Sequence, residues 1–311
     1  MIVNPNYRHN RTRANLSNWV TKAEWAESID IRYAEEDGYS LWGSEGIDPN
    51  DIFQGQLGNC WFMHAASAIA KRPHRLERVF LNDELSNNGI YGCQLYPLGV
   101  PTTVTIDDVI PLDEAGNSPF AKVSEDKALW GVLIEKCFAK LNGNYEAIVA
   151  GDPRSSIQVL SGSPSQRYKH TDITAIELFN KIKAADGTND MISASTPGQD
   201  NQNRTATGLA QNHVYTVLDV HEVVNERGQT VRLLRIRNPW GREEYNGFFN
   251  DDDSVNWDAR LRSQVQYLND NDGTFFIDIA TYKAEFESTS IHLDTTNMKH
   301  SYYLIQDDTS T

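Results

Sequence analysis

The sequence predicts an α+β fold in which a helical subdomain is followed by a β-rich subdomain. The chain has 311 residues, of which 39% are hydrophobic, and this is enough for a substantial core in about two domains. Long segments with apolar residues at helical spacing lie in the first half, whereas short β-branched and aromatic runs dominate the second. We predict an N-terminal arm over residues 1–45, with a short helical pattern over 21–29, a helical subdomain over 46–162 and a β-rich subdomain over 163–311.

Two helices and one pair of strands are predicted in the helical subdomain. Residues 60–72, CWFMHAASAIAKR, are apolar on almost every side and are followed by Pro73, as expected of a buried helix. Residues 127–141 place large apolar side chains at helical spacing and precede a glycine. Residues 91–95 and 102–106 are rich in β-branched and aromatic side chains and are separated by Pro and Gly, which favours paired strands.

The β-rich subdomain follows the run SGSPS at 161–165, which is the strongest linker candidate in the chain. Residues 225–228, NERG, have the composition of a hairpin turn between two apolar runs. A helix is predicted over 175–184, and strands are predicted over 213–220, 231–237 and 274–279.

Charge and composition exclude several classes of function. The 28 Lys and Arg against 43 Asp and Glu give a net charge of −15, which repels nucleic-acid phosphates and anionic membrane surfaces. No segment approaches the roughly 20 apolar residues of a membrane helix, and no apolar run of a signal peptide follows the N-terminal charges. The three cysteines, Cys60, Cys93 and Cys137, are too few for a disulfide scaffold, which favours unpaired thiols in a reducing, cytoplasmic compartment.

Cys60 has the sequence setting of a nucleophile. It opens a predicted helix directly after a glycine-containing stretch, and the N–H groups and dipole at a helix N-terminus favour the thiolate over the thiol. The backbone N–H of Cys60 and the side-chain amide of Gln54 are candidates for stabilising the oxyanion that forms when a thiolate attacks a carbonyl. Taken alone, a buried structural cysteine is the more common alternative.

A base and an orienting group follow in the β-rich subdomain. His213 lies at the head of one predicted strand, and Asn238 follows the end of the next. If these strands pair, Asn238 lies near His213 and accepts a hydrogen bond from one imidazole nitrogen, which directs the other toward Cys60. His64 shares the helix face of Cys60 and is the alternative base or a zinc ligand, but an apolar helix interior disfavours both roles.

With these motifs the sequence resembles the protease core of calpains, the calcium-dependent members of the papain-like cysteine peptidase superfamily. Four stretches carry the resemblance, in the family's order: QGQLGNCWF at 54–62, EKCFAKLNGNYEA at 135–147, GLAQNHVYTVLDV at 208–220 and RIRNPWGREEYNG at 235–247. The resemblance implies a papain-like fold with the active cleft between the helical and β-rich subdomains. Asn59 departs from the family pattern, which usually has Asp at this position.

The resemblance also implies a role for each site residue. Trp240 resembles the indole that shields the imidazole–amide pair, and Trp61 resembles the residue packed behind the thiol. The catalytic roles carried over are Cys60 as the nucleophile, His213 as the general base and acid, Asn238 as the orienting residue and Gln54 as the oxyanion donor.

Calpain cores hold two calcium ions, so the resemblance implies calcium as a cofactor. The first site matches the backbone carbonyls of Ser44 and Gly46 and the carboxylates of Asp51 and Glu146. The second site matches Glu244, Asp251, the carbonyl of Asp270 and Asp272. The family's last acid falls on Thr274 here, so we expect the second site to be weak or empty, because calcium affinity follows the number of charged ligands.

The predicted function is that of a calpain-type, calcium-dependent, intracellular cysteine endopeptidase. Its expected partners are protein substrates and a proteinaceous inhibitor, with no nucleic acid and no integral membrane segment. A catalytically silent calpain-like scaffold and a transglutaminase-type acyltransferase are the alternatives. The scaffold is disfavoured because all four catalytic positions match, and the transglutaminase because Asn238 stands where that class normally has Asp.

Overall fold

A computed structural model describes residues 27–30, 38–112, 118–242, 244–265, 267, 269–298 and 301 of the chain. Helices and strands are mixed in it, as the α+β prediction requires. The helices are α1 (Cys60–Ala70), α2 (Pro73–Val79), α3 (Trp130–Asn142), α4 (Pro153–Ser161), α5 (Ala175–Gly187), α6 (Ala259–Val265) and α7 (Ile279–Glu285). The strands are β1 (Glu27–Asp30), β2 (Ile90–Leu95), β3 (Thr102–Asp107), β4 (Val109–Leu112), β5 (Ser165–Lys169), β6 (Met191–Ser195), β7 (Val214–Val224), β8 (Thr230–Arg237), β9 (Thr274–Asp278) and β10 (Ser288–His292).

The helical half is built around α1, whose eleven residues are all buried. This burial explains why the sequence of α1 is apolar on every side. The predicted second helix, α3, begins at Trp130 rather than at 127, because Lys127 adopts a positive φ of 66° that a helix does not accommodate. Phe62 of α1 and Phe138 of α3 stack with their ring centroids 4.0 Å apart, which joins the two helices at the centre of this core.

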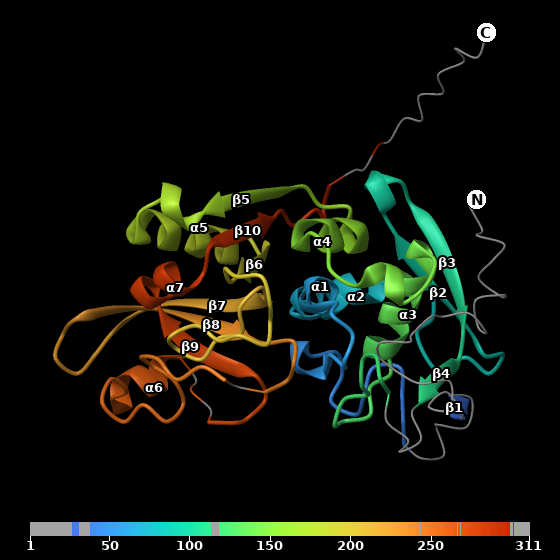
Figure 1. Ribbon diagram of the computed structural model, residues 1–311, viewed down its shortest axis with the longest axis horizontal. Helices are drawn as coiled ribbons and strands as arrows, with labels where there is room; N and C mark the ends of the chain where they lie inside the picture. The colour runs from blue at the N-terminus through green and yellow to red at the C-terminus, as the bar shows by residue number, and fades with distance from the viewer. Residues whose placement is uncertain are drawn as a thin grey trace, which may run out of the picture.

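The other half is a six-stranded antiparallel sheet with the strand order β5-β10-β6-β7-β8-β9. The predicted hairpin turn joins β7 to β8, and within it the N–H of Gly228 donates to the carbonyl of Asn225. In Figure 1 the sheet, with α5, α6 and α7, forms one side of the molecule, and α1 to α4 with the small β2-β3 sheet form the other. The helix α1 lies between them and packs against β6 and β7.

Buried contacts tie the two halves together next to the stretches that carry the catalytic candidates. Arg237, at the end of β8, is fully buried and donates hydrogen bonds to the backbone carbonyls of Asn50 (3.1 Å) and Ile52 (2.7 Å). The N–H of Gln54 donates to the carbonyl of Pro239 at 2.9 Å. The segment that leads into Cys60 is therefore fixed against the segment that follows β8.

Two expectations from the sequence are wrong. Residues 27–29, the end of the helix predicted over 21–29, belong to strand β1, which pairs with β4. Pairing with a neighbouring strand outweighs the weak local preference for a helix. Residues 1–26 and 31–37 lie outside the described part of the chain. Cys93 and Cys137 were expected to be unpaired, but they form a disulfide that joins β2 to α3. Sequence spacing does not reveal this pairing, since the fold brings residues 44 positions apart to a Cα–Cα distance of 6.4 Å.

The predicted linker at 161–165 is shorter in the structure. The helix α4 ends at Ser161, Gly162 takes the left-handed conformation with φ 71° that stops it, and β5 begins at Ser165. The division of the chain into an arm and two subdomains stays a prediction. No helix in the described residues is long and apolar enough to cross a membrane.

Candidate active site

Cys60 and His213 line one cleft of about 480 Å³. Cys60 is the first residue of α1 and only 8% exposed, while His213 immediately precedes β7. The cleft wall also contains Gly58 and Trp61 beside the thiol and Asn212 beside the imidazole. The predicted nucleophile and base, which lie 153 positions apart in the sequence, therefore face a common space.

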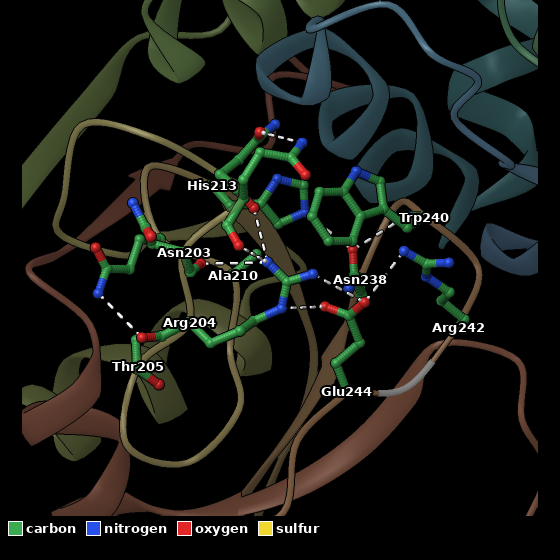
Figure 2. Close-up of polar contacts among 12 residues, drawn as sticks. Asn203, Arg204, Thr205, Ala210, His213, Asn238, Trp240, Arg242 and Glu244 are labelled. Atoms are coloured by element: carbon green, nitrogen blue, oxygen red, sulfur yellow. Dashed lines mark hydrogen bonds and ion pairs between the residues drawn. The ribbon is translucent and has the colours of Figure 1, made fainter.

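Asn238 fixes the orientation of the His213 ring (Figure 2). Nε2 of His213 lies 2.9 Å from Oδ1 of Asn238, and the same oxygen accepts a hydrogen bond from the backbone N–H of Trp240 at 3.1 Å. An amide oxygen only accepts, so Nε2 of the imidazole must be the protonated nitrogen. Nδ1 of His213 is buried and has no hydrogen-bond partner in the described residues. Its lone pair is therefore available to accept a proton.

Burial sets the charge state of the thiol and the imidazole. Removal from water raises the pKa of Cys60 to about 11, and it lowers the pKa of His213 to about 4 despite the hydrogen bond that His213 donates to Asn238. Both groups are consequently uncharged near neutral pH. In this state the thiol is the proton donor and Nδ1 of His213 is the acceptor, so a proton must pass between them when the sulfur attacks.

Two tryptophans flank the pair. The ring of Trp240 lies 4.3 Å from the His213 ring, centroid to centroid. Trp61 donates its indole N–H to the carbonyl of Ile148 at 2.8 Å, which holds its ring beside the start of α1. A Cβ at Gly151 would lie 2.4 Å from the Trp61 ring, so this position accepts only glycine while Trp61 keeps its place.

The side-chain amides of Gln54 and Asn59 each donate one hydrogen bond within the protein. Nε2 of Gln54 donates to the carbonyl of Leu57 at 2.6 Å, which leaves one more N–H of the same group for a ligand. Nδ2 of Asn59 donates to the carboxylate of Glu135 at 2.7 Å. Burial raises the pKa of Glu135 to about 7, so a neutral amide at position 59 avoids placing a second acid beside it. The role of Glu135 was not predicted, because its contact with Asn59 leaves no pattern in the sequence.

His64 is not among the residues that line the active-site cleft. It is fully buried, and Nδ1 lies 3.2 Å from the carbonyl of Cys60 in its own helix. Burial lowers its pKa to about 3. The described residues contain no group of three or more His, Cys, Asp or Glu side chains arranged to hold a metal ion, which gives a zinc role no support.

The residues expected at the first calcium site offer oxygen donors that suit this ion. Asp51 is buried and accepts hydrogen bonds from the Asp48 N–H and the Trp130 indole, and burial raises its pKa to about 7. A nearby cation would relieve the cost of keeping this carboxylate ionised. Ser44 and Gly46 lie in the loop before Asp51, and Glu146 opens a short 3₁₀ helix. Only two of the four expected donors are carboxylates, and the other two are backbone carbonyls.

Two of the acids expected at the second calcium site have protein partners in the described part of the chain. Glu244 forms ion pairs with Arg204 (2.9 Å) and Arg242 (3.2 Å). Asp272 accepts hydrogen bonds from the side chain of Asn50 and the N–H of Thr274. The described residues contain no group of three or more acidic, His or Cys side chains arranged to hold a metal ion. The carbonyl of Asp270 accepts a hydrogen bond from the N–H of Asp272 at 2.9 Å. Calcium binding at this second site stays a prediction.

Comparison with known proteins identifies a matching protein family and several longer relatives. A family model described as "Calpain family cysteine protease" matches residues 8–292. The chain is 30% identical to the human calpain-1 catalytic subunit over 255 residues, which are 79% of this chain and 35% of that protein. It is 26% identical to the calpain-type cysteine protease DEK1 of Zea mays over 281 residues, which are 88% of this chain and 12% of that protein. The chain thus spans about a third or less of the length of these relatives.

A solved structure of SERA5E from Plasmodium falciparum matches with a TM-score of 0.32 at 12% identity, over 80% of this chain and 92% of that one. This likeness is too distant to support a conclusion about the fold or the site.

Proposed function

Because the chain belongs to the calpain family of cysteine proteases, we propose that it is an endopeptidase that cleaves protein substrates with Cys60, His213 and Asn238 as its catalytic triad. The observation that carries the proposal is the state of His213. Its Nε2 donates to Asn238, its Nδ1 has no hydrogen-bond partner among the described residues, and His213 lines the same cleft as Cys60. A thiol and a correctly oriented neutral base are the two groups that thiol-based acyl transfer requires.

In the proposed acylation step, Nδ1 of His213 takes the proton of the Cys60 thiol as the sulfur attacks the scissile carbonyl carbon. The carbonyl electron pair moves to oxygen, and the Cys60 N–H and the second amide hydrogen of Gln54 stabilise the oxyanion. When the oxyanion collapses, the C–N bond breaks and the imidazolium returns the proton to the leaving amine. The product of this step is a thioester on Cys60 and a free peptide amine.

Deacylation repeats these roles with water. Nδ1 of His213 takes a proton from water, the hydroxyl adds to the thioester carbonyl, and the oxyanion again collapses, this time breaking the C–S bond. The imidazolium then protonates the departing sulfur, which restores the neutral thiol and imidazole. Asn238 holds Nε2 throughout, so the ring does not rotate while Nδ1 gains and loses a proton.

Calcium dependence is the regulatory part of the proposal. We assign the first site to Ser44, Gly46, Asp51 and Glu146, where calcium would supply the positive charge that the buried Asp51 carboxylate lacks. Asp51 lies three residues before Gln54, so calcium binding to this loop would help to fix the position of the Gln54 amide, the proposed oxyanion donor. Calcium titration calorimetry should show one main binding event that Asp51→Ala removes and Asp51→Asn weakens. A cytoplasmic location and a proteinaceous inhibitor remain predictions from the sequence.

An epoxide thiol inhibitor tests the proposed nucleophile directly. Incubation followed by peptide mass mapping should place the label on Cys60, and a peptide substrate should slow the labelling by competition. Cys93 and Cys137 serve as internal controls, because the disulfide between them has no free thiol. Absence of label on Cys60, in protein that cleaves no peptide, would favour the catalytically silent scaffold. Formation of isopeptide cross-links in place of peptide fragments would favour the transglutaminase.

A further inference from the structure

Arg204 organises the loop that leads from β6 into His213. This loop, residues 196–213, supplies much of one wall of the active-site cleft. Nη1 of Arg204 donates to the backbone carbonyls of three preceding residues, at 2.8 Å for Asn201 and 3.2 Å for both Gln202 and Asn203. One guanidinium therefore satisfies three carbonyls of the loop and holds its turn in one conformation.

The remaining face of the Arg204 guanidinium is tied to the segment that follows Asn238. Nε of Arg204 lies 2.9 Å from Oε2 of Glu244, and Nη2 donates to Oε1 at 3.2 Å. Nη2 of Arg242 lies 3.2 Å from the same Oε1. Figure 2 shows the Glu244 carboxylate between the two guanidinium groups. The single negative charge of Glu244 thus interacts with the two positive charges of Arg204 and Arg242.

Both arginines also approach Trp240, the indole that covers His213. The Cζ atoms of Arg204 and Arg242 lie 5.4 Å and 5.6 Å from the Trp240 ring centroid. This is within the range in which a cation is attracted to an indole. The same indole also packs against the His213 ring, at 4.3 Å between ring centroids. A continuous set of contacts therefore runs from the cleft loop through Arg204 and Trp240 to the proposed base.

We propose that Arg204, Glu244 and Arg242 form an arginine clasp that positions the 196–213 loop and Trp240 against His213. The clasp takes the place of the second calcium ion, since Glu244 is the first carboxylate that the family pattern assigns to that ion. Its three members are positioning residues and do not touch the substrate. The effect on turnover rests on the proposed function, whereas the ordering of the loop does not.

The first test compares Arg204→Gln with Arg232→Gln by amide hydrogen exchange and peptide hydrolysis. Arg232 is a matched control, because it too pairs with a glutamate at 2.9 Å, approaches an aromatic ring and is 33% exposed, against 35% for Arg204. We expect Arg204→Gln to speed exchange in the 196–213 loop at least tenfold and to lower kcat/KM about tenfold. Arg204→Lys keeps the charge toward Glu244 and should recover at least a third of the wild-type kcat/KM.

The second test asks whether the members act as one unit and whether calcium competes with them. Glu244→Gln should reproduce the Arg204→Gln effect, and the double variant should be no worse than either single variant. Calcium titration of Glu244→Gln should match that of the wild type. The clasp is overturned if loop exchange in Arg204→Gln equals that in Arg232→Gln, if the lysine variant is no better than the glutamine variant, or if Glu244→Gln loses a calcium-binding event. A wild-type protein without peptidase activity would refute the proposed function, but the exchange measurement would still decide the clasp.

Discussion

Replacement of Asn238 by alanine should both slow catalysis and destabilise the fold. In the wild type, Oδ1 of Asn238 accepts from Nε2 of His213 and from the N–H of Trp240, and Asn238 is 1% exposed. Asn238→Ala removes the one oxygen that accepts both hydrogen bonds. The His213 ring then has no group that fixes its tautomer, and protonation at Nδ1 would leave no lone pair facing the cleft.

The size of both effects follows from the two lost hydrogen bonds. A buried N–H left without an acceptor costs roughly 1–3 kcal/mol. We assign about 2 kcal/mol to the loss of each bond. The bond from His213 becomes charge-assisted when the imidazolium forms, so it is stronger in the transition state than in the ground state. If its loss costs about 2 kcal/mol there, kcat should fall about 30-fold, at roughly 1.4 kcal/mol per factor of ten. The free energy of unfolding should fall by about 2–4 kcal/mol, because both donors are affected.

Asn238→Asp is the matched control, because a carboxylate retains both acceptors. It should keep most of the stability, and its negative charge should raise the pKa of His213, moving the acid limb of the kcat/KM profile to higher pH. The assays are steady-state hydrolysis of a fluorogenic peptide and urea unfolding of each variant. If Asn238→Ala is folded and its kcat stays within threefold of wild type, Asn238 does not orient the base and the proposed triad is wrong.

The remaining predictions concern the two buried histidines and the glycine behind the thiol. His213→Ala should lower kcat by about three orders of magnitude, whereas His64→Ala should reduce stability with little change in kcat; the reverse pattern would exchange their roles. The lowered pKa of His64 means that only the unfolded state binds its proton between pH 6.5 and about 3. Urea unfolding should therefore show the wild type losing stability relative to His64→Gln as the pH falls through this range, by a few kcal/mol, with a constant difference above pH 7. Gly151→Ala should displace the Trp61 ring, quench or shift tryptophan fluorescence and lower kcat/KM at least tenfold, and unchanged kinetics would show that Trp61 is not needed behind the thiol.

The elements that could be predicted are those that are buried on every side or that follow a clear local sequence pattern. The helix α1 is buried on every side, and its apolar sequence with Pro73 after it marks both its nature and its end. The pairing of β7 with β8 was predicted from the turn at 225–228, and it brings Asn238 beside His213 as expected. Local sequence is informative here because each feature depends on neighbours close in the chain.

The features that could not be predicted depend on contacts between distant segments. The strand β10 is polar, STSIH, yet fully buried between β5 and β6, where Thr289 contacts His170 and Tyr282. Such residues satisfy one another only in the assembled sheet, so their sequence has no strand pattern. The pairing of Glu244 with Arg204 also joins residues that are distant in the sequence. The sequence therefore suggested Glu244 as a calcium ligand but could not reveal its arginine partner.

The most direct test of the account is cleavage of casein by the wild type and by Cys60→Ala, each with calcium and with a calcium chelator. The two proteins should have the same unfolding temperature within a few degrees, because the thiol is small and the residue opens the helix rather than filling its centre. We predict fragment formation by the wild type that is strongest with calcium, and none by Cys60→Ala under either condition. Fragment formation by folded Cys60→Ala at the wild-type rate would contradict the assignment of Cys60 as the nucleophile, and with it the proposed mechanism.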